Sequence, residues 1–193
     1  MRYFLELAFV VVTALLIGGG LSMLSIQSNL GFGAAIIGQW SAWPQAGSRN
    51  ADPYTKAKVA AAGEVPLGAA EGIAFHAKTD NRGEPLRLEC TYRDSGNTPQ
   101  APLWTLTAHD PTGAVVASRT GKASTLISRG IVRDATGRFL ITVSPVLAGG
   151  NWIETHGVGP FELIFRLYDT PSTSTSGLNN PEMPELILAG CKL

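Results

Sequence analysis

Short apolar runs, several of them alternating with polar residues, fill most of the chain after residue 70. In "FELIFRLYD" (161–169), Phe161, Leu163, Phe165 and Leu167 alternate with a second set of residues, Glu162, Ile164, Arg166 and Tyr168. Successive side chains of a strand point to opposite faces, so this pattern predicts a strand with one face in a core. Alternation and richness in β-branched and aromatic residues predict strands at 72–80, 86–94, 103–110, 114–119, 138–144 and 161–169.

Three copies of the pattern Asp-x-x-Gly lie between predicted strands, at residues 80–83, 110–113 and 134–137. Aspartate accepts hydrogen bonds from the backbone of its own turn, and glycine adopts the positive φ that closes a hairpin. Each copy therefore predicts a turn between adjacent antiparallel strands. Short strands at this spacing predict a mainly β fold, an antiparallel β-sandwich or jelly-roll-like domain.

A short helix is predicted before the strands. In "NADPYTKAKVAAAGE" (50–64), Asp52 suits the N-cap, Pro53 the first helical turn and Gly63 the exit. This helix would open the β-domain.

The N-terminus carries an uncharged apolar run, "LAFVVVTALLIGGGLSML", at residues 7–24. As a helix it would be about 27 Å long, close to the thickness of a bilayer core. A cleaved signal peptide is the alternative, but only Arg2 and the free amine precede the run as positive charges, and no clear cleavage site follows it. We predict an uncleaved transmembrane signal-anchor at 1–24, a linker at 25–51 and a β-sandwich domain at 52–193.

Two interpretations of the predicted linker stay open. Trp40 and Trp43 suit a membrane–water interface, where indole rings are enriched. Alternatively, Ile36, Ile37 and Trp40 dock on the folded domain.

The compartment decides the chemistry of Cys90 and Cys191. A leading signal-anchor normally leaves the bulk of the chain outside the cytoplasm, where thiols that lie close together are oxidised. We therefore predict an extracytoplasmic domain with a Cys90–Cys191 disulfide. In a cytosolic protein the two residues would be unrelated buried thiols, and neither lies in a zinc-binding pattern.

The charge balance excludes one class of partner. Lys plus Arg and Asp plus Glu each number 15, and no run of either sign occurs. Nucleic-acid binding needs a basic surface that displaces counterions, so we predict no nucleic-acid partner. The membrane is the partner that the sequence indicates, through the anchor helix.

The glycine-rich stretch after residue 149 holds the first four candidate binding residues, Asn151, Trp152, Glu154 and His156. With Tyr168 or Trp104 nearby, Trp152 would form an aromatic platform with a few polar groups, which is typical of small-ligand pockets. The alternative is that Trp152 packs over the edge of the sandwich and Asn151 satisfies loop backbone.

An enzyme is another interpretation of the same stretch. His156 and Glu154 would need a third group, such as His109 or Asp110, to bind a metal ion, and no Gly-x-Ser-x-Gly pattern supplies a nucleophile. We predict no catalytic residue, no metal and no cofactor, and we place His109 among the candidate binding residues.

Arg166 is the last candidate, on the same predicted strand face as Glu162. If that face is exposed, Arg166 is an ordinary surface residue. If the face is covered, the guanidinium needs a carboxylate, and Glu162, Glu89 and Asp169 are the nearest choices. We interpret Arg166 as structural first.

Four segments resemble a bacterial family, domain of unknown function 1214: "DPYTKAKVAAAGEVPLGAAEGIAF", "CTYRDSGNTPQAPLWTLTAHDPTG", "RDATGRFLITVSP" and "NWIETHGVGPFELIFRLYDTP". The resemblance covers about residues 52–171 and is most specific in Asn-Trp, Gly-Pro-Phe and Arg-Leu-Tyr. In that family the domain often follows another uncharacterised domain, number 1254, in whose place this chain has the apolar helix. The resemblance implies a β-rich fold and a cell-envelope location, but no reaction.

Residues and resemblance together predict an uncharacterised cell-envelope protein. We expect a single span of the bacterial inner membrane, with a C-terminal domain in the periplasm that binds a protein partner or a small ligand. The alternative is an envelope hydrolase or other enzyme with a site around residues 151–156.

Overall fold

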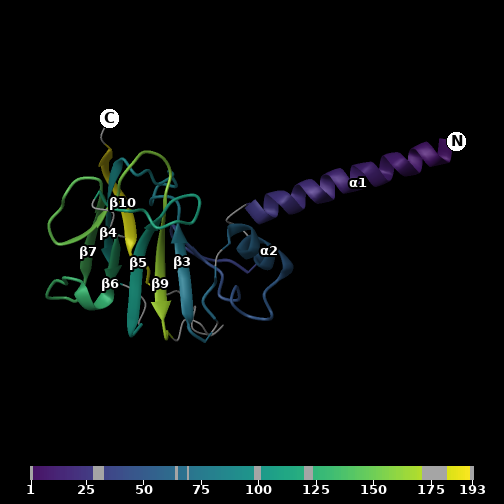
Figure 1. Ribbon diagram of the computed structural model, residues 1–193. Helices are drawn as coiled ribbons and strands as arrows, with labels where there is room; N and C mark the ends of the chain where they lie inside the picture. Colours follow the sequence, from purple (N-terminus) through teal and green to yellow (C-terminus); the bar gives the residue numbers. More distant parts are fainter. Residues whose placement is uncertain are drawn as a thin grey trace.

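Two β-sheets packed face to face form the folded domain, and a long helix leads into it (Figure 1). This computed structural model describes residues 2–27, 33–63, 65–68, 70–97, 101–119, 124–170 and 182–191. The predicted fold class is confirmed: the protein is mainly β, with a short helix before most of the strands and an apolar helix at the N-terminus.

Among the described residues, one sheet has six strands in the order β1-β2-β3-β9-β5-β6, and each neighbouring pair is antiparallel. Its strands are β1 (Ala35–Ile37), β2 (Trp40–Ala42), β3 (Gly72–Ala77), β9 (Glu162–Tyr168), β5 (Leu103–His109) and β6 (Thr125–Ile127). The other sheet has the order β10-β4-β7-β8. Its strands are β10 (Glu185–Cys191), β4 (Cys90–Gly96), β7 (Phe139–Ser144) and β8 (Asn151–Glu154). Here β7 and β8 run parallel, unlike the predicted antiparallel arrangement.

Five predicted strands appear as β3, β4, β5, β7 and β9. The sixth, at 114–119, forms only isolated bridges, including one between His109 and Val115. The edge of β5 beyond this bridge is taken instead by β6, which pairs with β5 from Thr105 to Thr107. A short 3₁₀ helix, η1 (Ser128–Gly130), follows β6.

Aromatic side chains from both sheets pack together in the core. The ring of Trp104 lies 4.8 Å from Phe165 in the same sheet and 5.6 Å from Phe139 in the facing sheet, measured between centroids. Trp40 meets Phe165 edge-on at 5.8 Å. Full burial of a side chain of this size contributes about 1.5–3 kcal/mol, so this cluster is a large part of what holds the two layers together.

Part of the stretch predicted as a linker belongs to the six-stranded sheet. Strand β2 pairs with β3, and Trp40 lies opposite Ala77. The Trp40 side chain is 1% exposed, and its indole N–H donates to the carbonyl of Pro184 at 2.7 Å. Of the two open interpretations, the geometry of Trp40 is that of a residue docked on the domain.

All three Asp-x-x-Gly segments are turns, as predicted. In each, the glycine N–H donates to the aspartate carbonyl at 3.0 Å, and the glycine φ lies between 82° and 85°. Antiparallel bridges close the turns between Thr79 and Pro85, His109 and Val115, and Arg133 and Phe139. The turns at 80–83 and 134–137 differ from the prediction in one respect, because the nearest strands on either side belong to different sheets: β3 and β4 at the first turn, β6 and β7 at the second.

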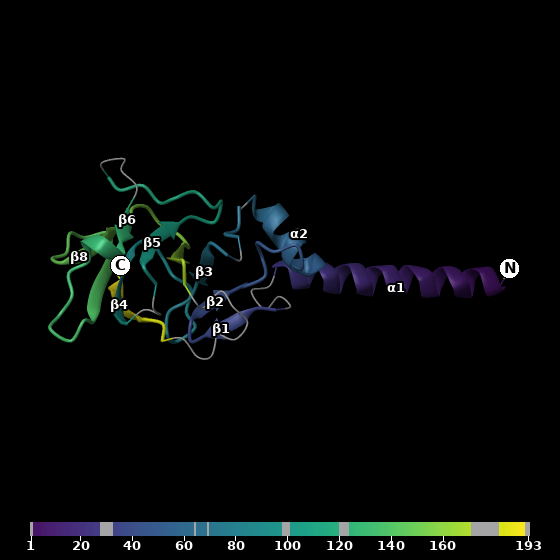
Figure 2. The same cartoon turned by 90° about the horizontal axis from the view of Figure 1, so that it is seen from below.

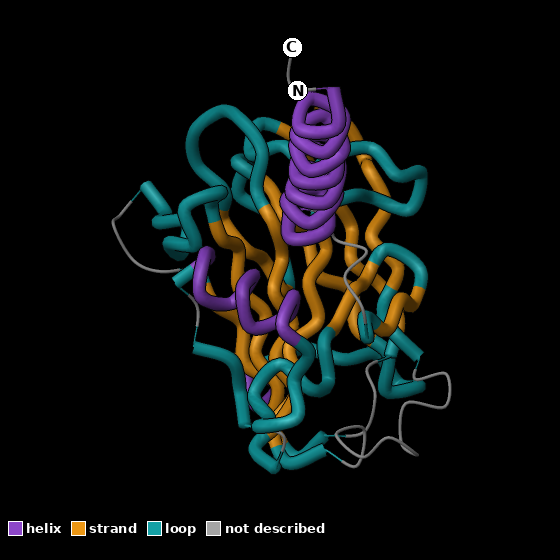
Figure 3. Tube along the Cα trace, turned by 90° about the vertical axis from the view of Figure 1, so that its right-hand side faces the viewer, coloured by secondary structure: helices purple, strands orange, loops and turns teal. Residues whose placement is uncertain are grey.

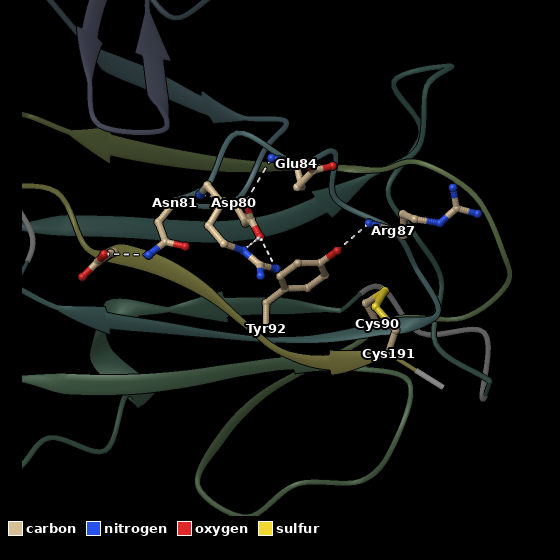
Figure 4. Close-up of polar contacts among 9 residues, drawn as sticks. Asp80, Asn81, Glu84, Arg87, Cys90, Tyr92 and Cys191 are labelled. Carbon is tan, nitrogen blue, oxygen red and sulfur yellow. Dashed lines mark hydrogen bonds and ion pairs between the residues drawn. A yellow bond between two sulfur atoms is a disulfide. The ribbon is translucent and has the colours of Figure 1, made fainter. Parts of the chain in front are cut away.

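This crossing between the sheets is tied to the C-terminal strand (Figure 4). Asp80 is 2% exposed and accepts two backbone N–H groups within the turn. The Asn81 side chain donates to Glu185 of β10 at 2.9 Å. The Tyr92 hydroxyl accepts the backbone N–H of Arg87 at 2.8 Å, which fixes the end of the crossing against β4.

The Cys90–Cys191 disulfide is confirmed. The two residues are register partners on β4 and β10, and their Cα atoms are 4.0 Å apart (Figure 4). The two cysteines are 101 positions apart in the sequence, so the bond closes a long loop of the chain. It therefore restricts the unfolded chain strongly.

Replacing both cysteines, Cys90→Ala with Cys191→Ala, should lower the free energy of unfolding by about 2–4 kcal/mol. Urea unfolding of the full chain in detergent micelles measures the loss. A reductant should destabilise the unsubstituted protein by a similar amount and leave the double variant unchanged. Equal stability of the oxidised protein and the double variant would contradict the expectation.

Asp94 is a fully buried carboxyl on β4, opposite Ile141 and Leu186. Within the described part of the chain, neither of its oxygens has a hydrogen-bond partner. Burial raises the pKa of Asp94 from 3.8 to about 8, because a lone charge is costly in apolar surroundings. Asp94 is therefore mostly protonated in the folded protein at pH 7.

Asp94→Asn should flatten the pH dependence of stability. Asp94 has a higher pKa in the folded than in the unfolded chain, so its contribution is complete below pH 3.8 and is lost as the pH rises towards 8. Relative to the variant, the free energy of unfolding should fall by up to about 1.4 kcal/mol per pH unit in this window. Urea titrations from pH 5 to 8 measure it. Asp134→Asn, in an exposed turn, should retain the slope, and a slope equal in all three proteins would refute the assignment.

Helix α2 (Pro53–Ala62) forms where the sequence predicts it. The Asp52 carboxylate accepts the N–H groups of Tyr54 and Thr55, and Gly63 ends the helix with a φ of 64°. Figure 3 shows α2 in front of the strands of the six-stranded sheet. The helix therefore covers part of the sheet face that points away from the core.

Helix α1 (Arg2–Gln27) extends away from the sheets (Figures 1 and 2). Within its segment Arg2–Leu24, the apolar stretch of 18 residues has a mean hydropathy of 2.3 and is not buried in the protein. By length and composition this helix is able to cross a membrane.

Candidate functional site

A cavity of about 380 Å³ lies between α2 and the outer face of the six-stranded sheet. Strands β3 and β9 form its floor, and α2 contributes walls together with the segment 43–46, Gly63 and the residues 65–67. Gly72 and Ala74 leave space above the sheet at the floor of the cavity, because they carry little or no side chain. A Cβ at Gly72 would lie 2.1 Å from the carbonyl oxygen of Leu167, so close pairing of β3 with β9 requires glycine there.

One end of the floor holds a carboxylate with two basic neighbours. Glu162 of β9 lies 3.7 Å from His76 Nδ1 and 3.6 Å from Lys78 Nζ, and its side chain is 12% exposed. Burial raises the pKa of the Glu162 carboxyl, but His76 and Lys78 outweigh this effect and hold the pKa below its usual range. Glu162 is therefore charged at neutral pH.

Arg166 lies four residues after Glu162, on the same face of β9. Its Nη1 donates to Thr107 Oγ1 at 3.1 Å, and Thr107 Oγ1 lies 2.9 Å from His109 Nε2. His109 Nδ1 lies 2.9 Å from the carbonyl oxygen of Gly113. Because a carbonyl only accepts, His109 Nδ1 donates to Gly113. This chain of hydrogen bonds positions the guanidinium.

The wall opposite the floor carries an indole and an ammonium group. Lys58 Nζ of α2 lies 3.4 Å from the centroid of the Trp43 ring, a cation–π contact. Trp43 also meets the ring of His76 edge-on at 5.9 Å. Among the described residues, the buried indole Nε1 of Trp43 has no hydrogen-bond partner.

The structure divides the seven predicted binding residues between the two sheets. Arg166 and His109 belong to the group around the cavity, joined through Thr107. Tyr168 lies further along the same face of β9, opposite Gly72 and Leu103. The other four residues are on β8 or directly after it, in the four-stranded sheet.

Asn151 is used by the fold. It is 7% exposed, accepts the N–H of Val132 at 2.7 Å and donates to the carbonyls of Val132 and Leu140. This arrangement matches the interpretation in which Asn151 satisfies loop backbone.

The neighbours of Asn151 do not share an interaction partner. The indole N–H of Trp152 donates to the carbonyl of Ser144 at 3.1 Å, and Glu154 lies 3.8 Å from Arg119. His156 is exposed, and within the described residues it makes no hydrogen bond or ion pair. These residues do not form an acid–base pair.

Sequence reasoning missed the cavity residues His76, Lys78, Trp43 and Lys58. The alternation in 161–169 placed Glu162 and Arg166 on one face of their strand. A similar alternation in 72–80 places His76 on the other face of its strand from Phe75. The missing information was that β3 and β5 flank β9. Arg166 forms no ion pair with Glu162, Glu89 or Asp169; Glu162 pairs with His76 and Lys78, and Glu89 with Arg87.

Three or more His, Cys, Asp or Glu side chains placed to hold a metal ion do not occur within the described ranges. The cavity groups instead offer hydrogen-bond donors and one carboxylate.

These features define a class: a β-sandwich domain with a helix-covered cavity on the outer face of one sheet. The chain belongs to the family "Protein of unknown function (DUF1214)", whose model matches residues 71–172. The match includes the sheet side of the cavity but not Trp43 or Lys58.

Two solved structures resemble the chain. The VPA0106 protein of Vibrio parahaemolyticus has a TM-score of 0.57 and 20% identity over 72% of this chain and 36% of its own. This likeness supports the fold. A putative uncharacterized protein from Burkholderia cenocepacia has a TM-score of 0.42 and 14% identity over 92% of this chain and 51% of its own. The chain thus spans between about a third and about a half of these proteins, and no curated protein matches it.

Proposed function

We propose that this protein is anchored in the bacterial inner membrane by α1 and binds a small polar ligand in the cavity under α2, on the periplasmic side. The observation that carries the proposal is the convergence of His76, Glu162 and Arg166 on the floor of one cavity. Its volume lies at the lower end of the range typical of small-ligand sites.

The location rests on two further observations. The apolar segment Arg2–Leu24 is long enough to span a bilayer. The Cys90–Cys191 disulfide suits an oxidising compartment. In this proposal residues 1–24 are the anchor, and the domain of residues 52–193 includes in its sheet the strands β1 and β2 from the preceding stretch.

Binding fits the cavity better than catalysis. A general base works best with a pKa near the working pH, whereas the pKa of Glu162 is held below its usual range by His76 and Lys78. At the alternative enzyme site, residues 151–156, Asn151 is taken up by backbone and His156 is exposed.

An alkaline phosphatase fusion after residue 193 should be active, because this enzyme requires disulfides that form only outside the cytoplasm. The matched control is a β-galactosidase fusion at the same residue, which should be inactive. The reverse pair of activities would place the domain in the cytoplasm and refute the proposed location.

Filling the cavity floor should abolish ligand binding. Ala74→Leu adds three carbons between β3 and α2, whereas Ala189→Leu makes the same change at an exposed site on β10. A thermal-shift screen with small acids, amines, phosphates and sugars should find compounds that raise the Tm of the unsubstituted protein and of Ala189→Leu but not of Ala74→Leu. The proposal fails if no compound binds or if Ala74→Leu binds as well as Ala189→Leu.

A further inference from the structure

We infer that the cavity under α2 takes a small organic anion, whose carboxylate or phosphate oxygens bind Arg166 and whose apolar part lies against Val59, Val65 and Leu67. This inference rests on the proposed function, since it names the chemistry of the ligand for the same cavity.

The charge of the cavity favours an anion. Among the described lining residues, Lys58, Lys78 and Arg166 are cationic and Glu162 is the one carboxylate. Glu162 is already placed between His76 and Lys78. A cationic ligand would therefore meet the positive charge of Arg166, whereas an anion would be attracted by it.

Arg166 has donors to offer. A guanidinium carries five N–H groups in a planar fork that matches a carboxylate or phosphate. In the described part of the chain, Arg166 donates one hydrogen bond, to Thr107, and lies within 4 Å of no carboxylate. Thr107 is held by His109, which is held by Gly113. The guanidinium is thus oriented without being neutralised.

The remaining walls set the shape of the ligand. Val59, Val65, Pro66 and Leu67 form an apolar side of the cavity. A fully polar polyol would gain little there and would leave the charge of Arg166 without a counterion. An anion with a short apolar body satisfies both sides.

Four compounds with the same four-carbon chain test the inference: butyrate, butyl phosphate, butyramide and butylamine. Isothermal titration uses the full chain in lipid nanodiscs, with protein-free nanodiscs as the blank. Butyrate or butyl phosphate should bind at least about tenfold more tightly than butyramide, since a charged hydrogen bond is worth more than a neutral one. Whichever of the two acids binds more tightly identifies the oxyanion.

Two variants locate the contact. Arg166→Gln should reduce the affinity for the acid to that for butyramide, while Arg166→Lys, which keeps the charge but loses the fork, should fall between. Arg93→Gln, the same change on the exposed face of β4, should bind like the unsubstituted protein. Thermal unfolding of each variant confirms that it is folded.

The outcomes distinguish failure of the anion inference from failure of the proposed function. If butyramide or butylamine binds as tightly as the acids, and Ala74→Leu abolishes this binding, the anion inference is overturned and the proposed cavity remains. Acid binding that Arg166→Gln leaves unchanged also overturns the inference. If none of the four compounds binds, or if Ala74→Leu binds them unchanged, both the inference and the proposed function are overturned.

Discussion

The alternation of side chains along β9 is the constraint on which both the core and the cavity depend. Leu163, Phe165 and Leu167 are fully buried between the sheets, and Glu162 and Arg166 lie on the opposite face. β9 pairs with β5 along its whole length and, on its other side, with β3 from Leu163 to Tyr168. A slip of one residue would bury both charged side chains and expose Phe165, so the register is strongly specified. The same register places Glu162 opposite His109 and Arg166 opposite Ala74.

Local sequence patterns predicted several of the elements correctly, but they did not predict which strands pair with each other. The three Asp-x-x-Gly turns and helix α2 follow from residues adjacent in sequence, and the structure confirms them. Strands β1 and β2 have three residues each, too few for an alternation to be visible. The link between Arg166 and His109 depends on Thr107, which the pairing of β5 with β9 brings near. No pattern within one segment shows that pairing.

The stretch 151–156 shows the opposite case, in which residues close in sequence do not act together. Its polar residues lie within six positions, which suggested a site. Yet Asn151 faces the backbone of residues 132 and 140, Glu154 pairs with Arg119, and His156 is exposed. Alternation places Asn151 on the other face of β8 from Trp152 and Glu154, and His156 lies beyond the end of the strand, so closeness in sequence does not gather these side chains.

Two buried carboxyls show how neighbours decide charge in this fold. Asp94 has no cation nearby among the described residues, so burial alone acts on it and it keeps its proton. Glu162 is also buried, but His76 and Lys78 keep it ionised. Asp94 therefore adds no charge to the core over most of its population at pH 7. In the cavity, the charge of Glu162 is already balanced by His76 and Lys78. Arg166 differs from both, because its partner is a hydroxyl. The guanidinium is oriented by Thr107, and no carboxylate of the described residues pairs with it. This uncompensated charge is the physical reason to look for the ligand at Arg166 rather than at Glu162.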